Sequence, residues 1–249
     1  MSNKIVIRDV LLLDPASAGP ARRGDVVVEN GTIAAVTEPN TADIANARTI
    51  DGHERLLMPG LVNSHTHSPT NVLKGTGDIL SHPAFMWRNQ ADTAGRTPDE
   101  ISLSALFGCI EHLLGGTTAI VDHFPEQGFS DADVDAVVDA YHTAGIRALV
   151  ALRIFDEAYT DIEPPGGYPD GFTIENPLVP SPLDESISLV ETAIGRHHRT
   201  AGGRIEICPA PSNPMRCSDA LLCSVVDVAG RHDTAIHMHL LETAVQAKI

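Results

Sequence analysis

The chain has 249 residues, of which 43% are hydrophobic, and a formal net charge of −16 at pH 7. The acidic residues are spread along the chain, and a surface of this sign repels polyanions, so nucleic acid and anionic membranes are not expected as partners. The apolar content is sufficient for a soluble core in one large domain or two small ones. A small neutral or cationic substrate is compatible with this charge.

Cysteine usage and hydropathy point to a reducing compartment. The four cysteines, Cys109, Cys208, Cys217 and Cys223, have no CxxC spacing and lie in apolar helix or strand contexts. Reduced, buried thiols are therefore expected rather than disulfides. No apolar run approaches the roughly 20 residues of a membrane-spanning helix, and the N-terminus has no signal-peptide pattern. We therefore expect a cytoplasmic protein.

Residues 1–57 have the pattern of short strands joined by turns. Asn30 and Gly31 separate two β-rich runs, which is the strongest short signal for a hairpin. No segment of this region has helical periodicity. We predict a small β-sandwich here, or half of one.

Residues 58–249 alternate between strand and helix patterns. Strands are predicted near 58–66, 117–124, 146–155, 204–211 and 234–242, and helices near 97–115, 130–145, 184–200 and 218–230. Alternation at this spacing predicts parallel strands with right-handed crossovers. The prediction is an α/β fold, an incomplete (β/α)8 TIM-type barrel of about five strands. An open doubly wound sheet is the alternative, but no glycine-rich phosphate turn follows the first strand.

Two long segments interrupt this alternation. Residues 68–98 are expected to form a functional loop with a short helix, and residues 156–183, rich in Pro and Gly, a mobile lid over the site. The histidines of helices and loops, His82 among them, are expected to be solvated. The chain stops at Ile249, where the next helix should begin, so we expect it to be the N-terminal part of a larger protein.

Two histidines, His65 and His67, stand one residue apart at the end of LMPGLVNSHTHS, which has the apolar run of a strand covered on both faces. Alternate side chains of a strand point the same way, so both imidazoles are directed at one spot, as in half of a zinc or iron site. The alternative is a pair of ordinary surface histidines. A second pair further along the chain favours the metal site.

That second pair lies in HMHLLET, where His237 and His239 share a predicted strand face and Glu242 follows. The carboxyl ends of parallel barrel strands form one rim, where catalytic groups collect. His65, His67 and His239 are therefore candidate metal ligands. Glu242 is the candidate catalytic residue, because a carboxylate there can move a proton from a metal-activated water to a leaving group. The alternative is a strand that runs into an acidic helix N-terminus.

Four segments in this order, PGLVNSHTH, GGTTAIVDH, ICPAPSNPMRCSDALL and HMHLLET, resemble the amidohydrolase superfamily. More narrowly, the chain is similar to the aminohydrolase branch that holds purine, pterin and S-adenosylhomocysteine deaminases and triazine hydrolases. The likeness runs over the whole chain, the N-terminal strands included, and its first segment is the most specific. The chain corresponds to the N-terminal portion of such a protein.

The resemblance implies one divalent metal ion, with Zn²⁺ ahead of Fe²⁺, held by His65, His67 and His239. It implies that Glu242 shuttles the proton. No lysine lies in RIEICPAP, so the bridged two-metal variant is not expected. The family's site is completed by a further histidine and an aspartate, which would lie beyond Ile249.

Four residues are candidate substrate contacts. His123 ends the second strand, where the resemblance places a substrate contact, and simple packing is the alternative. Trp87, the only tryptophan, either stacks on a planar heterocycle or fills an apolar gap. Ser212 and Asn213 follow the fourth strand and either contact substrate or form a turn. Asp122 is expected to hold a backbone amide or His123.

Two functions from different classes follow. The first is metal-dependent hydrolysis of a C–N bond in a cyclic amidine-type base, in which metal-held hydroxide attacks the carbon carrying the amine or halide and Glu242 transfers the proton. Its partner would be a small heterocyclic substrate; the leaving group and a homo-oligomeric state are left open. The second is a catalytically inactive half-barrel, either a truncated remnant or a binding module.

Overall fold

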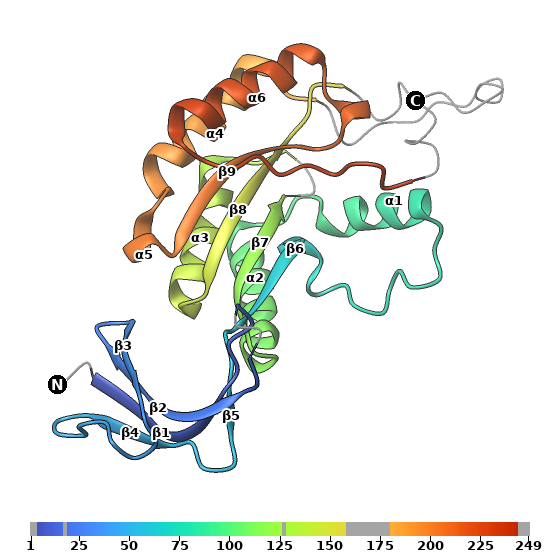
Figure 1. The fold of residues 1–249 in the computed structure, drawn as a ribbon. Coiled ribbons are helices and arrows are strands. Elements are labelled where there is room, and N and C mark those ends of the chain that lie inside the picture. Colours follow the sequence, from blue (N-terminus) through green and yellow to red (C-terminus); the bar gives the residue numbers. More distant parts are fainter. Residues whose placement is uncertain (1–3, 17–18, 126–127, 158–179, 244–249) are drawn as a thin grey trace, which may run out of the picture. The chain divides into compact units, whose positions relative to one another are not determined.

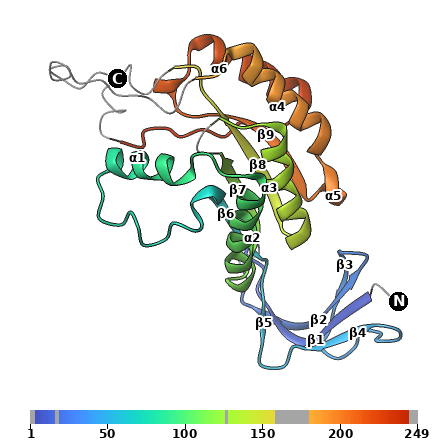
Figure 2. The same ribbon diagram turned by 180° about the vertical axis from the view of Figure 1, so that it is seen from behind.

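The computed structural model describes residues 4–16, 19–125, 128–157 and 180–243 (Figures 1 and 2). Most of the predicted lid, residues 156–183, lies outside these ranges. The chain divides into two compact units, residues 1–60 and 61–249, which are described separately. No helix in the described ranges is long and apolar enough to cross a membrane.

The first unit is one sheet with the order β3-β2-β1-β4, and β5 pairs with β1 beyond β4. Its strands are β1 (Lys4–Leu12), β2 (Arg22–Glu29), β3 (Thr32–Thr37), β4 (Arg48–Asp51) and β5 (Leu56–Leu57). The predicted hairpin joins β2 to β3, with Asn30 at φ 52° and Gly31 at φ 80°. A turn with two positive φ values matches the twist of antiparallel strands, which explains the Asn-Gly pair.

A buried carboxylate ties the strands of this sheet to a loop. Asp25 on β2 is fully buried. Its side chain accepts hydrogen bonds from the backbone N–H groups of Asp9 (2.8 Å), Asn40 (2.9 Å) and Ala42 (3.0 Å). Burial alone would raise the pKa of Asp25, but these three donors outweigh it and leave the pKa below its usual value.

The second unit is built on a parallel sheet of order β6-β7-β8-β9. The strands are β6 (Leu61–Thr66), β7 (Thr117–Phe124), β8 (Arg147–Ile154) and β9 (Ile205–Pro211), and the α-helices are α1 (His82–Thr93), α2 (Pro98–Leu114), α3 (Asp131–Ala144), α4 (Leu183–His197), α5 (Thr200–Gly203) and α6 (Asp219–His232). Short 3-10 helices cover Ser68–Thr70 and Pro214–Arg216. The predicted alternation of parallel strands and helices is confirmed for these four strands.

Helices α2, α3, α4 and α6 cover one face of this sheet (Figures 1 and 2). On β8, Val150, Leu152 and Ile154 face these helices and belong to the main core. Ala151 lies on the opposite face, in a small cluster with Cys208 and Ala210. The alternation along the strand thus separates a packed helix side from a side lined by small residues.

Helix ends follow the local signals in the sequence. Thr97 caps α2 in a capping box with Glu100. Ser130 and Asp133 form the corresponding box at the start of α3, which ends at Gly145 with φ 75°. Reciprocal hydrogen bonds of this kind satisfy backbone donors that the first helical turn leaves open.

The structure corrects two expectations for the second unit. The apolar run before His65 predicted a strand buried on both faces, but β6 is the edge strand, and Leu61 and Val62 are 50% and 68% exposed. The predicted fifth strand, residues 234–242, is not a regular strand. It runs beside β9 with two backbone contacts, from the N–H of His237 and of His239. The described part of this sheet therefore has four strands rather than about five.

Candidate metal centre

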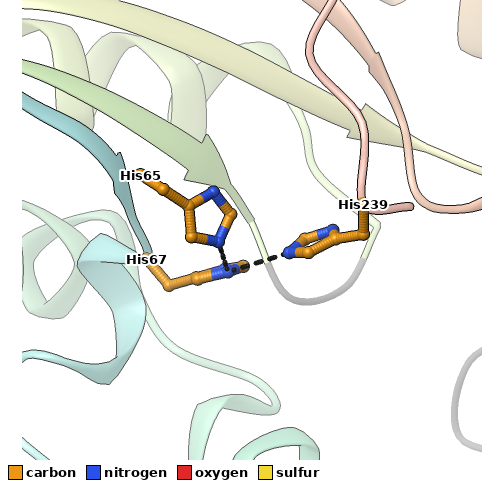
Figure 3. Close-up of side chains that lie close together, drawn as sticks. All are labelled: His65, His67 and His239. Atoms are coloured by element: carbon orange, nitrogen blue, oxygen red, sulfur yellow. Dashed lines mark hydrogen bonds between the residues drawn. The ribbon is translucent and has the colours of Figure 1, made fainter. Parts of the chain in front are cut away.

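Three histidines converge at the carboxyl ends of the parallel strands (Figure 3). His65 lies near the end of β6, and His67 immediately follows that strand. His239 comes from the segment that runs beside β9. Nε2 of His67 lies 3.1 Å from Nε2 of His65 and 3.3 Å from Nε2 of His239. One ligand atom of each of the three lies within 4.8 Å of the others.

These spacings fit a divalent metal ion. Two nitrogens bound tetrahedrally to zinc at roughly 2.0–2.1 Å lie roughly 3.3 Å apart. Both short nitrogen–nitrogen distances at His67 are close to that value. Burial, and then the proximity of His67, lowers the pKa of His239, which favours the neutral imidazole that binds metal. The placement of His67 between His65 and His239 therefore fits a shared metal ion.

The outer nitrogens of two of these rings have hydrogen-bond partners. Nδ1 of His239 lies 3.1 Å from the carbonyl oxygen of Ser212, which can only accept, so Nδ1 carries the proton and Nε2 keeps its lone pair for the cluster. Nδ1 of His65 lies 2.9 Å from Nε2 of His237. Contacts of this kind fix the tautomer and orientation of a ligating histidine.

His237 is a residue that the sequence argument did not select. It shares a face with His239, as the HMH spacing predicted, but it contacts His65. Burial, and then the neighbouring His239, lowers the pKa of His237. A neutral His237 can accept a hydrogen bond at Nε2 from the Nδ1–H of His65.

His123 lies beneath the cluster rather than on an open wall. It is fully buried, and its ring centroid is 4.4 Å from that of His239 and 5.3 Å from that of His67. Burial, and then repulsion from the positive charges of protonated His239 and Arg153, hold the pKa of His123 well below its usual value. Within the described ranges neither ring nitrogen has a hydrogen-bond partner.

A cavity of about 90 Å³ opens beside the cluster. It is lined by His67, Thr70, Phe85, Met86, Asn89, Arg153, Ser212, Asn213, His239 and Glu242. The walls thus combine two candidate metal ligands, the candidate catalytic carboxylate, and both apolar and polar side chains. Cavities of this mixed character, with a few convergent polar groups, are typical of small-molecule sites.

Glu242 has a partner from another element. Its Oε1 lies 2.9 Å from Nε2 of His82, the first residue of α1. His82 was expected only to be solvated; its side chain keeps 31% of its surface exposed and also contacts this carboxylate. The contact holds Glu242 against α1 on the cavity wall. A contact between residues 160 positions apart leaves no local signal in the sequence.

Arg153 is the second residue that the sequence argument missed. It lies near the carboxyl end of β8, is only 4% exposed, and lines the cavity. Its Nε donates a hydrogen bond of 3.0 Å to Oγ of Ser212. The sequence signal that could have identified it is an arginine near the end of the apolar strand RALVALRI, because a charged side chain in a buried strand rarely lies inside without a partner or a role.

Of the four candidate substrate contacts, two line the cavity and two do not. Ser212 and Asn213 line the cavity, and Asn213 also accepts a hydrogen bond from the N–H of Met215, which makes it part of a turn as well. Trp87 lies on α1, but Phe85 and Met86 of that helix line the cavity and Trp87 does not. His123 lies under the histidine cluster and is likewise absent from the lining.

A parallel α/β sheet with histidines and a carboxylate gathered beyond its strand ends is typical of metal-dependent barrel enzymes. The sequence model of the amidohydrolase family matches residues 56–247, and the chain belongs to this family. The relatives it matches include deaminases and, among solved structures, triazine hydrolases.

The 5'-deoxyadenosine deaminase of Methanothermobacter thermautotrophicus is 31% identical over 246 residues, which cover 97% of this chain and 50% of the relative. The structure of an adenosine deaminase from Xanthomonas campestris with bound zinc superposes with a TM-score of 0.76 at 26% identity, over 97% of this chain and 50% of that one. A triazine hydrolase variant shares the fold with a TM-score of 0.81 at 22% identity, over 99% and 55% of the two chains. The chain spans about half the length of the curated relatives it matches.

Proposed function

We propose that the chain carries the metal-binding part of a deaminase-like aminohydrolase that hydrolyses a C–N bond of a small planar heterocycle. One observation carries this proposal: three imidazoles gather within ligand reach of one another, and two of them, His67 and His239, line the cavity that the Glu242 carboxylate also lines. Membership of the amidohydrolase family supports it, as do the deaminases among the relatives.

We further infer that the parallel sheet is the first part of a (β/α)8 barrel, over residues 58–249, preceded by part of a β-sandwich over residues 1–57. The right-handed alternation of strand and helix supports the barrel. So does the superposition on chains of about twice the matched length. In this arrangement β6 is the first barrel strand, and the segment beside β9 takes the place of the fifth.

The metal ion would be held by His65, His67 and His239, with Zn²⁺ ahead of Fe²⁺. When bound, such an ion lowers the pKa of a coordinated water towards ~7 and so supplies a nucleophile at neutral pH. Glu242 borders the same cavity and can accept a proton and pass it to a ring nitrogen or leaving amine. His82 holds the Glu242 carboxylate at the cavity wall.

The walls of the cavity match a flat, nitrogen-rich ring. Phe85 and Met86 offer apolar surface, while Arg153, Ser212 and Asn213 offer polar groups at its edge. We assign Ser212 and Asn213 to substrate binding. His123 and Trp87 would act from outside the cavity lining, His123 from its buried position against His67 and His239 and Trp87 from α1.

The test is product release by the zinc-loaded protein from 5'-deoxyadenosine, adenosine and a chlorinated triazine, measured as ammonia or chloride. Ammonia from a purine nucleoside is the expected result, and Glu242→Gln should abolish most of it. Chloride release alone would redirect the proposal to dehalogenation. No release from any of the three by protein that holds zinc would contradict it.

A binding module without turnover is the second candidate. Exposed apolar side chains favour it: Val62 on β6 and Leu103, Ile110 and Leu114 on α2 are 57–85% exposed. Apolar patches of this kind mark surfaces that another element or chain covers. Association with another chain that depends on these side chains, in protein that releases no product, would support this candidate.

A further inference from the structure

The residue that follows His67 is held on both of its backbone polar groups by buried side chains. The backbone N–H of Ser68 donates a 2.8 Å hydrogen bond to Oδ1 of Asp122 on β7. Its carbonyl oxygen accepts a 2.7 Å hydrogen bond from Oγ of Ser104 on α2. Ser68 and Ser104 are 2% exposed and Asp122 is fully buried.

A third element fixes the carboxylate itself. Tyr141 on α3 is 1% exposed, and its hydroxyl donates a 2.5 Å hydrogen bond to Oδ2 of Asp122. Asp122 and its neighbour Thr66 are paired across β7 and β6, so the carboxylate stands on the helix side of the sheet at the level where β6 ends. Tyr141, Asp122 and Ser104 form a set that we call the Ser68 clamp.

The clamp acts next to a candidate ligand. His67 is the last residue before the 3-10 helix, with φ −128° and ψ 95°, and Ser68 opens that helix. The peptide that joins them includes the clamped N–H of Ser68. This planar unit includes the Cα of His67, so fixing it restrains the backbone from which the His67 side chain projects.

Packing alone does not explain the clamp, because apolar side chains would fill the same space at a lower desolvation cost. Burying a carboxylate and two hydroxyls is costly unless each is hydrogen-bonded, and replacement of such a network by apolar groups is often neutral or stabilising. A network that is fully satisfied, however, rigidifies its surroundings and specifies one geometry. Its location beside His67 indicates which geometry is specified.

We propose that the Ser68 clamp is a positioning device for the metal centre, in which Asp122, Tyr141 and Ser104 hold the His67 imidazole in its ligand orientation. This inference rests on the proposed metal centre. None of the three residues touches the cavity or the metal; they act through the backbone of Ser68. Partners that hydrogen-bond a ligating side chain directly typically contribute 10–100-fold in metal affinity, and this range is the upper bound for the clamp, which acts through the neighbouring backbone.

The experiment measures Co²⁺ affinity of the full chain by competition with a chelator, together with the visible absorption of the bound ion and the thermal unfolding of the metal-free protein. Asp122→Ala should raise the dissociation constant by up to about 10–100-fold and change the Co²⁺ spectrum. Tyr141→Phe and Ser104→Ala should shift both in the same direction by a smaller factor. Asp122→Asn should recover part of the affinity, since an amide oxygen still accepts from Ser68.

Two controls separate positioning from general loss of stability. Val137→Ala truncates a fully buried side chain one turn before Tyr141 on α3, and Ser186→Ala removes a buried hydroxyl on α4. Both should leave the Co²⁺ affinity and spectrum unchanged, even where Val137→Ala lowers the Tm. Should Asp122→Ala fail to fold, Tyr141→Phe and Ser104→Ala decide the matter.

Three outcomes would overturn the proposal. Folded clamp variants with unchanged affinity and spectrum would reduce the clamp to a structural feature, while the metal centre stood. Equal weakening by Val137→Ala would assign the effect to stability. A wild-type chain that holds no Co²⁺ would contradict the metal centre itself, and the clamp with it.

Discussion

Nδ1 of His65 lies 2.9 Å from Nε2 of His237, and Nε2 of the same His65 ring faces Nε2 of His67 at 3.1 Å. One imidazole thus joins the candidate metal cluster on one side and a second histidine on the other. This arrangement gives His237 a role in setting the tautomer of His65.

His237→Phe should therefore weaken metal binding without removing a ligand. The phenyl ring has a similar volume but cannot accept the hydrogen bond from His65 Nδ1–H, so the affinity should fall about 10–100-fold while the stoichiometry stays at one ion. Chelator competition with Co²⁺ measures it. His142→Gln, an exposed histidine on α3, is the control and should have no effect. Equal affinity of His237→Phe and wild type would remove His237 from the account.

Glu242→Gln tests the proton transfer. The amide keeps the shape of the side chain but cannot accept a proton, and general acid–base catalysis is worth roughly 10²–10⁴ in rate. We expect kcat to fall by about that factor and the metal content to stay the same, since Glu242 is not a ligand in this account. Unchanged kcat with lowered stability would mean that Glu242 only anchors α1 through His82.

Much of this site followed from local patterns. The HTH and HMHLLE spacings brought His65, His67 and His239 into one group because alternate residues of an extended segment face one way and parallel strand ends meet at one rim. The Asn30-Gly31 hairpin followed in the same way, since it depends on residues within a few positions.

Tertiary context decided the rest. Leu61 and Val62 have the composition of a buried strand, yet β6 lies at the sheet edge, because burial depends on which strand pairs on the far side. The segment 234–242 makes one backbone hydrogen bond to β9, from His237 to Pro209, and one just beyond it, from His239 to Ser212, too few for a regular strand. His82 and Arg153 acquired their neighbours across long sequence separations, which no local pattern records.

The first unit should depend on the buried Asp25 carboxylate. Asp25→Ala leaves three backbone N–H groups, those of Asp9, Asn40 and Ala42, without their acceptor. Buried donors that lose a partner cost about 1–3 kcal/mol each, less where water can enter, so a loss of about 3 kcal/mol in unfolding free energy is expected. Urea unfolding of the full chain measures it. Asp14→Ala, an exposed aspartate in the same unit, is the control.

The same carboxylate gives a pH dependence of known sign. The pKa of Asp25 in the folded chain lies below the usual 3.8, so the folded state binds a proton less readily than the unfolded state. The carboxylate therefore stabilises the fold fully at pH values above 3.8, and this stabilisation is lost as the pH falls through the lower pKa of the folded state. The stability difference between wild type and Asp25→Asn should therefore shrink on going from pH 6 to pH 2. A difference that grows with acidity would contradict the assignment.

The exposed Cys223 should react faster with thiol reagents than the three buried cysteines. Burial raises the pKa of Cys109 and of Cys208 to about 12 and also raises that of Cys217, whereas Cys223 is exposed. Because the thiolate is the reactive form, only Cys223 should react quickly with a disulfide reagent at pH 8. Denaturant should release the other three. Rapid reaction of a second thiol in the native chain would show that one of the buried sites opens. Rapid reaction that remains in Cys223→Ser would show the same.

Metal stoichiometry tests the central claim most directly. After equilibrium dialysis against Zn²⁺, elemental analysis should find about one ion per wild-type chain, because the three histidines form one cluster, in which both Nε2 distances from His67 are close to those of tetrahedral ligands. His65→Ala and His67→Ala should each reduce this to near zero, while His142→Gln should keep it at one. Two tightly held ions per wild-type chain, or one ion retained by His67→Ala, would contradict the metal centre described for this protein.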